Sequence, residues 1–90
     1  MKLNQSRIEI ASSVLAGLDI LSPNEREPVL QAIDSLENFS LQSTLPSNIQ
    51  KFTPSDIPIF YLLQATPSYR VIFEIDDQNK IKISHMFVKG

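Results

Sequence analysis

The chain has 90 residues, with eight Lys and Arg against ten Asp and Glu, two Gly, one His and no Cys. This length fits one domain over residues 1–90. The absence of Cys excludes disulfides and thiolate nucleophiles, and a single His excludes paired-histidine metal sites. Two glycines are too few for a glycine-rich phosphate loop, so we expect neither metal nor cofactor. The formal net charge of −2 argues against a generally basic nucleic-acid binder.

The N-terminal residues 1–7 are not followed by the apolar segment of a secretory signal. No apolar run approaches the roughly 18 residues that a membrane helix needs. We therefore expect a cytoplasmic protein that makes no contact with a membrane.

The first forty residues predict a short strand followed by two helices. Residues 7–11 alternate between polar and apolar side chains, as a strand does. One face of a helix then follows, with Ser12 or Ser13 as its N-cap. The apolar residues of that face are Ala11, Val14, Leu15, Leu18 and Leu21.

A capping box at residues 22–25 begins the second helix. Pro28 does not fit a helix that starts at Pro23, so the helix either begins nearer Arg26 or has a kinked first turn. The turn between the two helices is very short, which predicts an antiparallel helical hairpin. The apolar stripe of the second helix is Val29, Ala32, Ile33, Leu36 and Phe39.

Residues 40–58 are rich in Ser, Thr and Pro and predict a long loop that contains a short strand at 49–52. The last third predicts three strands, at 59–65, 69–75 and 81–88. The expected fold is α+β, in which the N-terminal strand and the helical hairpin pack on one face of an antiparallel sheet of about four strands.

The register of the last hairpin decides which side chains share a face. A three-residue loop at 77–79 gathers the aromatic side chains under the helices, where Phe73 faces Ile83 and Val71 faces His85. The same register leaves Arg70 on the open face, opposite Met86. A two-residue loop would instead put Arg70 and Glu74 beside Phe87 and Ile83, so we favour the longer loop.

The final two strands read Y-R-V-I-F-E-I at 69–75 and I-K-I-S-H-M-F-V-K at 81–89. Together with the order of the elements, they resemble the RelE/ParE family of toxins from bacterial toxin–antitoxin pairs. A family member typically reads Y-R-V-I-Y-E-I, a polar turn, and I-x-I-x-D-x-F-x-K. The resemblance covers nearly the whole chain in layout, and its motifs lie in the last third.

The resemblance implies that the protein binds a cognate antitoxin. Members of the RelE branch are ribosome-dependent mRNA endonucleases, and members of the ParE branch poison DNA gyrase. Cleavage of RNA by its own 2′-OH needs a proton acceptor, a proton donor and a cation at the phosphate, and it needs no metal.

Candidate site residues follow from the matching positions. Arg70 matches the Arg that RelE nucleases place on the phosphate, and Lys89 matches the Lys near the end. His85, where the family often has Asp, is a candidate general base. Lys51 and Lys82 are candidate RNA contacts. The structural alternatives are a surface Arg70 paired with Glu74 or Gln64, and a cross-strand pair between Lys82 and Glu74.

A second hypothesis keeps the fold without the catalysis. Val88 stands where active members often carry His or Tyr, and the net charge is negative. The domain would then be a protein-binding module that acts on gyrase or binds only its antitoxin. The acidic residues are concentrated in residues 1–40, with a formal charge of three minus six, or −3, against five minus four, or +1, for residues 41–90.

Overall fold

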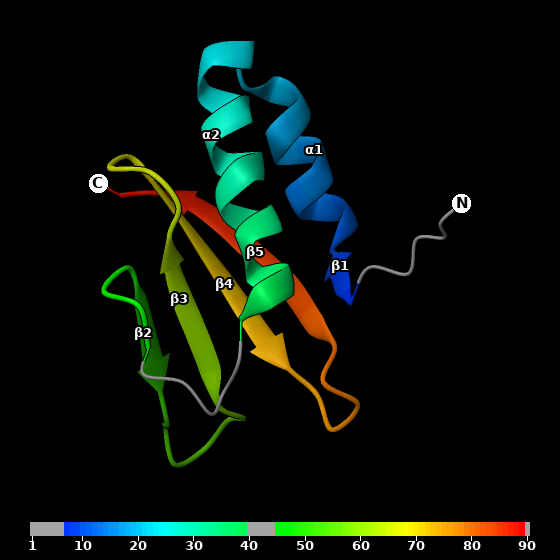
Figure 1. The fold of residues 1–90 in the computed structure, drawn as a ribbon, viewed down its shortest axis with the longest axis vertical. Coiled ribbons are helices and arrows are strands. Elements are labelled where there is room, and N and C mark those ends of the chain that lie inside the picture. Colours follow the sequence, from blue (N-terminus) through cyan, green and yellow to red (C-terminus); the bar gives the residue numbers. More distant parts are fainter. Residues whose placement is uncertain (1–6, 40–44, 90) are drawn as a thin grey trace.

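The computed structural model describes residues 7–39 and 45–89. Its α+β architecture places two helices on one face of a five-stranded sheet (Figure 1). The helices are α1 (Ser12–Ile20) and α2 (Pro23–Asp34), followed by the short 3₁₀ helix η1 (Ser35–Asn38). The strands are β1 (Ile8–Ile10), β2 (Ile49–Phe52), β3 (Phe60–Gln64), β4 (Tyr69–Ile75) and β5 (Ile81–Val88).

The strands are ordered β1-β5-β4-β3-β2 across the sheet. The pairs from β2 to β5 are antiparallel, as the sequence predicts, whereas β1 pairs with β5 in parallel. The sheet therefore has one strand more than the predicted four, because β1 joins its edge instead of packing on its face. Residues 40–44 of the predicted long loop lie outside the described residues.

The N-termini of the two helices differ in part from the predicted ones. α1 has Ala11 at its N-cap, so the predicted serine cap is wrong. α2 begins at Pro23 and continues through Pro28, so it does not begin nearer Arg26. Ser22 precedes it, and the Ser22 carbonyl accepts hydrogen bonds from the Glu25 and Arg26 N–H groups. Its side chain caps no backbone N–H, so the predicted capping box does not form.

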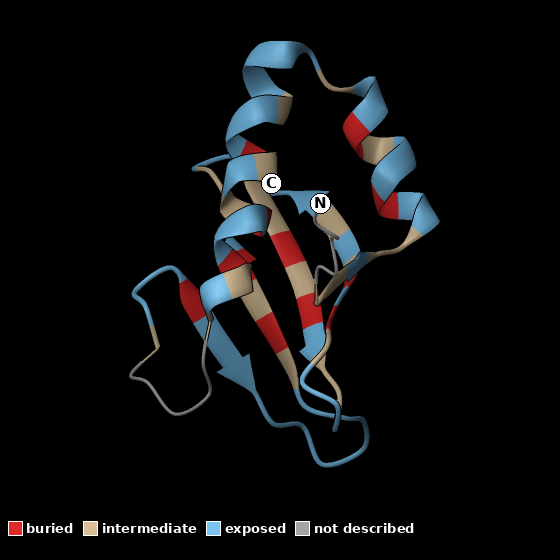
Figure 2. Cartoon of the chain, turned by 45° about the vertical axis from the view of Figure 1, so that its right-hand side comes forward, coloured by how far each residue is buried: buried red, intermediate tan, exposed pale blue. Residues whose placement is uncertain are grey.

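The hydrophobic core lies between the helices and the face of the sheet that they cover (Figure 2). Val71 and Phe73 on β4 are fully buried there, as the predicted register requires. Phe39 packs edge-on against the rings of Tyr61 and Phe73. The buried side chains are Val14, Leu18, Val29, Ile33, Leu36, Ile49, Tyr61, Leu63, Val71, Phe73, Ile81 and Ile83.

The β4–β5 hairpin closes through the predicted three-residue loop. The Asp76 N–H donates to the Lys80 carbonyl, and Asn79 takes a positive φ of 67°. A type I turn followed by one left-handed residue is a common three-residue hairpin loop, and Asn tolerates that conformation. Ile75 then faces Ile81, and Phe73 faces Ile83, as predicted.

Candidate functional site

A β-bulge in β5 changes which residues share the open face, the face of the sheet opposite the helices. The register shifts between Ile72 and Phe73, so that Ile72 faces His85 while Phe73 still faces Ile83. Ser84 is the extra residue of the bulge. The predicted pairing of Val71 with His85 is therefore wrong, and His85 lies on the open face instead of under the helices.

The bulge moves the later residues of β5 in the same way. Met86 faces Val71 and turns toward the helices, where its Cε would lie 3.0 Å from a Cβ added at Gly17. Phe87 takes its place opposite Arg70, and Val88 faces Tyr69. The predicted pair of Arg70 with Met86 is thus wrong, and Val88 does not share the face of Arg70.

His85 is exposed and held by its neighbour on the bulge. The Ser84 hydroxyl donates to the Ile72 carbonyl at 3.3 Å, and the His85 Nδ1 lies 3.0 Å from the same hydroxyl oxygen. The donor and acceptor in this pair depend on the tautomer of the ring, and the tautomer protonated on Nδ1 would donate to the hydroxyl oxygen.

Arg70 lies on the open face near the β3–β4 turn. Its Nη1 donates to the carbonyls of Thr66 at 3.1 Å and Pro67 at 3.2 Å, with a longer contact of 3.4 Å to Tyr69. It forms no ion pair within the described residues, so the predicted alternative pairing with Glu74 is not seen. The turn thus orients the guanidinium, and no carboxylate of the described residues pairs with it.

The three candidate lysines lie in different places. Lys82 faces Glu74 across the hairpin as predicted, but its Nζ lies 3.9 Å from the Asp76 carboxylate. The Lys89 N–H donates to the Ser68 carbonyl at 2.8 Å, which places Lys89 at the same end of the sheet as Arg70. Lys51 faces Tyr61, whose side chain points toward the helices, so Lys51 is not on the open face.

An apolar hollow lies beside His85, and no sequence pattern indicated it. Its volume is 290 Å³. The loop before β3 forms one wall, and the Phe60 ring stacks on Phe52 with the centroids 5.0 Å apart. The lining residues are Ile57, Pro58, Phe60, Ile72, Glu74, Ser84 and His85. Apolar side chains that stay exposed around such a hollow favour contact with another macromolecule.

Within the described ranges, no three His, Asp or Glu side chains come together in a way that could hold a metal ion. The helices of those ranges are also too short and too polar to cross a membrane.

No protein-family model matches the chain, and no curated protein sequence matches it significantly. A solved structure does resemble it: the crystal structure of the archaeal RelE–RelB complex from Pyrococcus horikoshii OT3. The superposition has a TM-score of 0.73 and covers 93% of this chain and 94% of the other, with 24% sequence identity. The chain therefore has the RelE-like α+β fold that its last two strands predict.

Proposed function

We propose that this protein is the RelE/ParE-like toxin component of a type II toxin–antitoxin pair, and that it cleaves mRNA on the ribosome without a metal. The observation that carries the proposal is the bulge at Ser84, which brings His85 onto the same face as Arg70. The RelE-like fold and the complex of RelE with RelB support an antitoxin partner. The ribosome as target implies a cytoplasmic protein.

The chemistry assigns one role to each group. His85 Nε2 accepts the proton of the ribose 2′-OH as its oxygen attacks the adjacent phosphorus. Arg70 stabilises the charge that develops on the phosphate oxygens. The bond from phosphorus to the 5′ oxygen breaks, and Lys89 supplies a proton to that oxygen. The products are a 2′,3′-cyclic phosphate and a 5′-hydroxyl end, and Lys82 adds positive charge along the RNA.

Induced expression in bacteria tests this function. We expect wild-type protein to arrest growth and primer extension on a translated mRNA to show new 5′ ends. His85→Ala and Arg70→Ala should relieve the arrest, and Arg70→Lys separates loss of charge from loss of the turn contacts. Lys51→Ala is the matched control, because Lys51 lies off the open face. Normal growth with soluble wild-type protein would overturn the toxin assignment.

A second function is favoured by the apolar character of the open face. Phe87 lies opposite Arg70 and is 43% exposed, and Ile57 is 56% exposed. Neither side chain can contribute acid–base chemistry, whereas both suit a protein contact. The domain would then be a non-catalytic module of the same fold that binds gyrase or only its antitoxin. Growth arrest without new 5′ ends would support this second function and reject RNA cleavage.

A further inference from the structure

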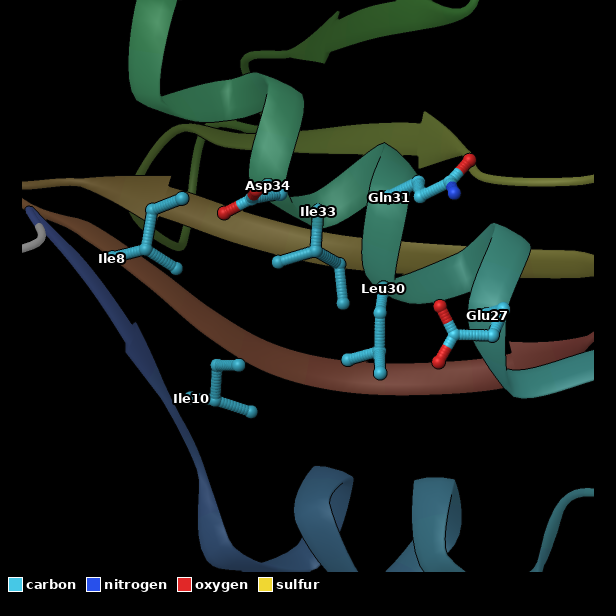
Figure 3. Close-up of a pocket in the computed structure, with 7 residues that line it drawn as sticks. All are labelled: Ile8, Ile10, Glu27, Leu30, Gln31, Ile33 and Asp34. Atoms are coloured by element: carbon cyan, nitrogen blue, oxygen red, sulfur yellow. The ribbon is translucent and has the colours of Figure 1, made fainter. Parts of the chain in front are cut away.

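A second hollow lies on the helix side of the sheet, between β1 and α2. Its volume is 330 Å³. Figure 3 shows aliphatic side chains from the edge strand and from α2 approaching one another, with polar side chains of α2 along one margin. The lining residues are Ile8, Ile10, Glu27, Leu30, Gln31, Ile33 and Asp34. We call this hollow the β1–α2 groove.

The polar margin of the groove is acidic and regular. Glu27, Gln31 and Asp34 follow a spacing of four and three residues, so they lie one above another on a single face of α2. The two carboxylates are separated by about 10 Å along the helix, at a rise of about 1.5 Å per residue. Neither carboxylate forms an ion pair within the described residues, and none of the lining residues is basic.

The surroundings of the groove have the same sign of charge. Residues 7–39 contain two Arg and six Asp and Glu, a formal charge of two minus six, or −4. Arg7, which is counted in this sum, is held by backbone carbonyls and by Asn79 and forms no ion pair with Glu27 or Asp34 within the described residues. This part of the molecule therefore repels nucleic acid and also repels the same surface on a second copy of the chain.

We propose that the β1–α2 groove binds a basic segment of a protein partner. An aliphatic side chain of that segment fills the hollow against Leu30 and Ile10, and flanking Lys or Arg side chains reach Glu27 and Asp34. The apolar floor supplies affinity, and the two carboxylates supply orientation and charge selectivity. This surface is separate from the open face, so the molecule can hold the partner segment while the open face is occupied.

Binding of a labelled synthetic peptide tests the charge requirement. The probe has four Lys alternating with three Leu, and a control peptide carries Glu in place of Lys. We expect the double variant Glu27→Lys and Asp34→Lys to weaken binding of the Lys probe by about tenfold or more, which is about 1.4 kcal/mol. The matched control is the double variant Asp19→Lys and Asp56→Lys, which has the same net charge as the groove variant. It should weaken binding of the Lys probe by less than about threefold. Equal losses would show binding to the overall negative field and would overturn the proposal.

The apolar floor is tested separately. Leu30→Gln removes a groove residue that is only partly buried, and Leu15→Gln is its control because Leu15 is 48% exposed on α1 outside the groove. Only Leu30→Gln should weaken binding of the Lys probe, by about fivefold or more. Amide shifts in NMR spectra should map to β1 and α2. Shifts confined to the open face, or dimerisation in place of peptide binding, would contradict the proposed occupant. None of these readings depends on growth arrest, so this proposal and the proposed function fail independently.

Discussion

The guanidinium of Arg7 holds Asn79, which lies 72 residues later in the chain, through two hydrogen bonds. Its Nε donates to the Asn79 carbonyl at 2.9 Å, and its Nη2 donates to the Asn79 side-chain oxygen at 3.0 Å. The Nη1 of the same group donates to the Glu37 and Phe39 carbonyls, at 3.0 and 2.9 Å. One side chain thus joins the N-terminal strand, the end of η1 and the β4–β5 turn.

Loss of this side chain should destabilise the whole fold. Arg7→Ala leaves several carbonyls without their charged donor, so we expect the free energy of unfolding to fall by about 2–3 kcal/mol. Arg7→Lys keeps the charge but cannot make four directed hydrogen bonds, and should recover only part of the loss. Urea denaturation measures both. Arg26→Ala is the control, and an equal effect of the two alanine substitutions would show that the Arg7 contacts contribute nothing.

The left-handed conformation of Asn79 makes a separate prediction. Asn79→Gly and Asn79→Ala both remove the side-chain contact with Arg7. The difference in stability between the two variants therefore reports only the cost of the backbone conformation. Because alanine is strained at a φ of 67° and glycine is not, the alanine variant should be less stable by about 1 kcal/mol. Thermal unfolding of the two variants side by side measures this difference. Equal midpoints would mean that the loop takes another conformation.

Asp76 should make stability depend on acid pH. Its Oδ1 accepts hydrogen bonds from the Lys80 and Gln78 N–H groups, each at 2.9 Å. The Lys80 N–H is the main cause that lowers the pKa of this carboxyl below 3.8, and Lys82 contributes through its charge. A lowered pKa in the folded state stabilises the fold above the unfolded pKa, and this contribution is lost as the pH falls through the folded pKa.

Asp76→Asn isolates that charge, because an amide oxygen can accept the same two hydrogen bonds. We expect wild type to exceed the variant in melting temperature at pH 6, with the gap closing as the pH falls below about 4. Calorimetry over this range is the measurement. A gap that stays constant with pH would show that the carboxylate charge does not matter.

Gly17 offers a stabilising substitution. A glycine inside a helix costs up to about 1 kcal/mol relative to alanine. An added Cβ would lie 3.0 Å from the Met86 Cε, which is the far end of a flexible side chain and can move by a few tenths of an ångström. Gly17→Ala should therefore raise the free energy of unfolding by about 0.5 kcal/mol, whereas Gly17→Leu should lower it. A destabilised alanine variant would show that Met86 is held in place.

Tyr61 should titrate at unusually high pH. Its side chain is buried between Phe39 and Phe73, and this burial raises the pKa of its hydroxyl above 10.0. A raised pKa stabilises the fold at lower pH, and that contribution is lost as the pH rises through the folded value. Tyrosinate absorbance should show a titration above the usual range that belongs to Tyr61. Tyr61→Phe should remove this late titration, and its persistence in the variant would show that the Tyr61 hydroxyl is not its source.

Local patterns were sufficient to predict most elements of this fold. The β-rich runs at 69–75 and 81–88 predict β4 and β5 at their observed bounds, and the short strand predicted at 49–52 is β2. The polar turn predicted the loop at 77–79 and the first cross-strand pairs. These features depend on neighbours in the chain, which is why residue spacing and turn chemistry suffice for them.

The site was predicted only in part, for an identifiable reason. Arg70 reached the open face as predicted, because nothing interrupts the alternation of β4. His85 did not follow the prediction, because one extra residue at Ser84 reverses the alternation beyond it. The run from 83 to 88 contains apolar residues in both registers, so its sequence does not reveal where the bulge falls.

Residue patterns alone are enough to establish the α+β class, the order of the elements and the residues that have chemistry to offer. Three features arise only when the chain has folded: His85 shares a face with Arg70, Arg7 binds Asn79, and β1 and α2 enclose an acidic groove. Each of these depends on segments that are far apart in the chain. Their contact is set by the packing of helices on the sheet and by one bulge, and neither leaves a local pattern in the sequence.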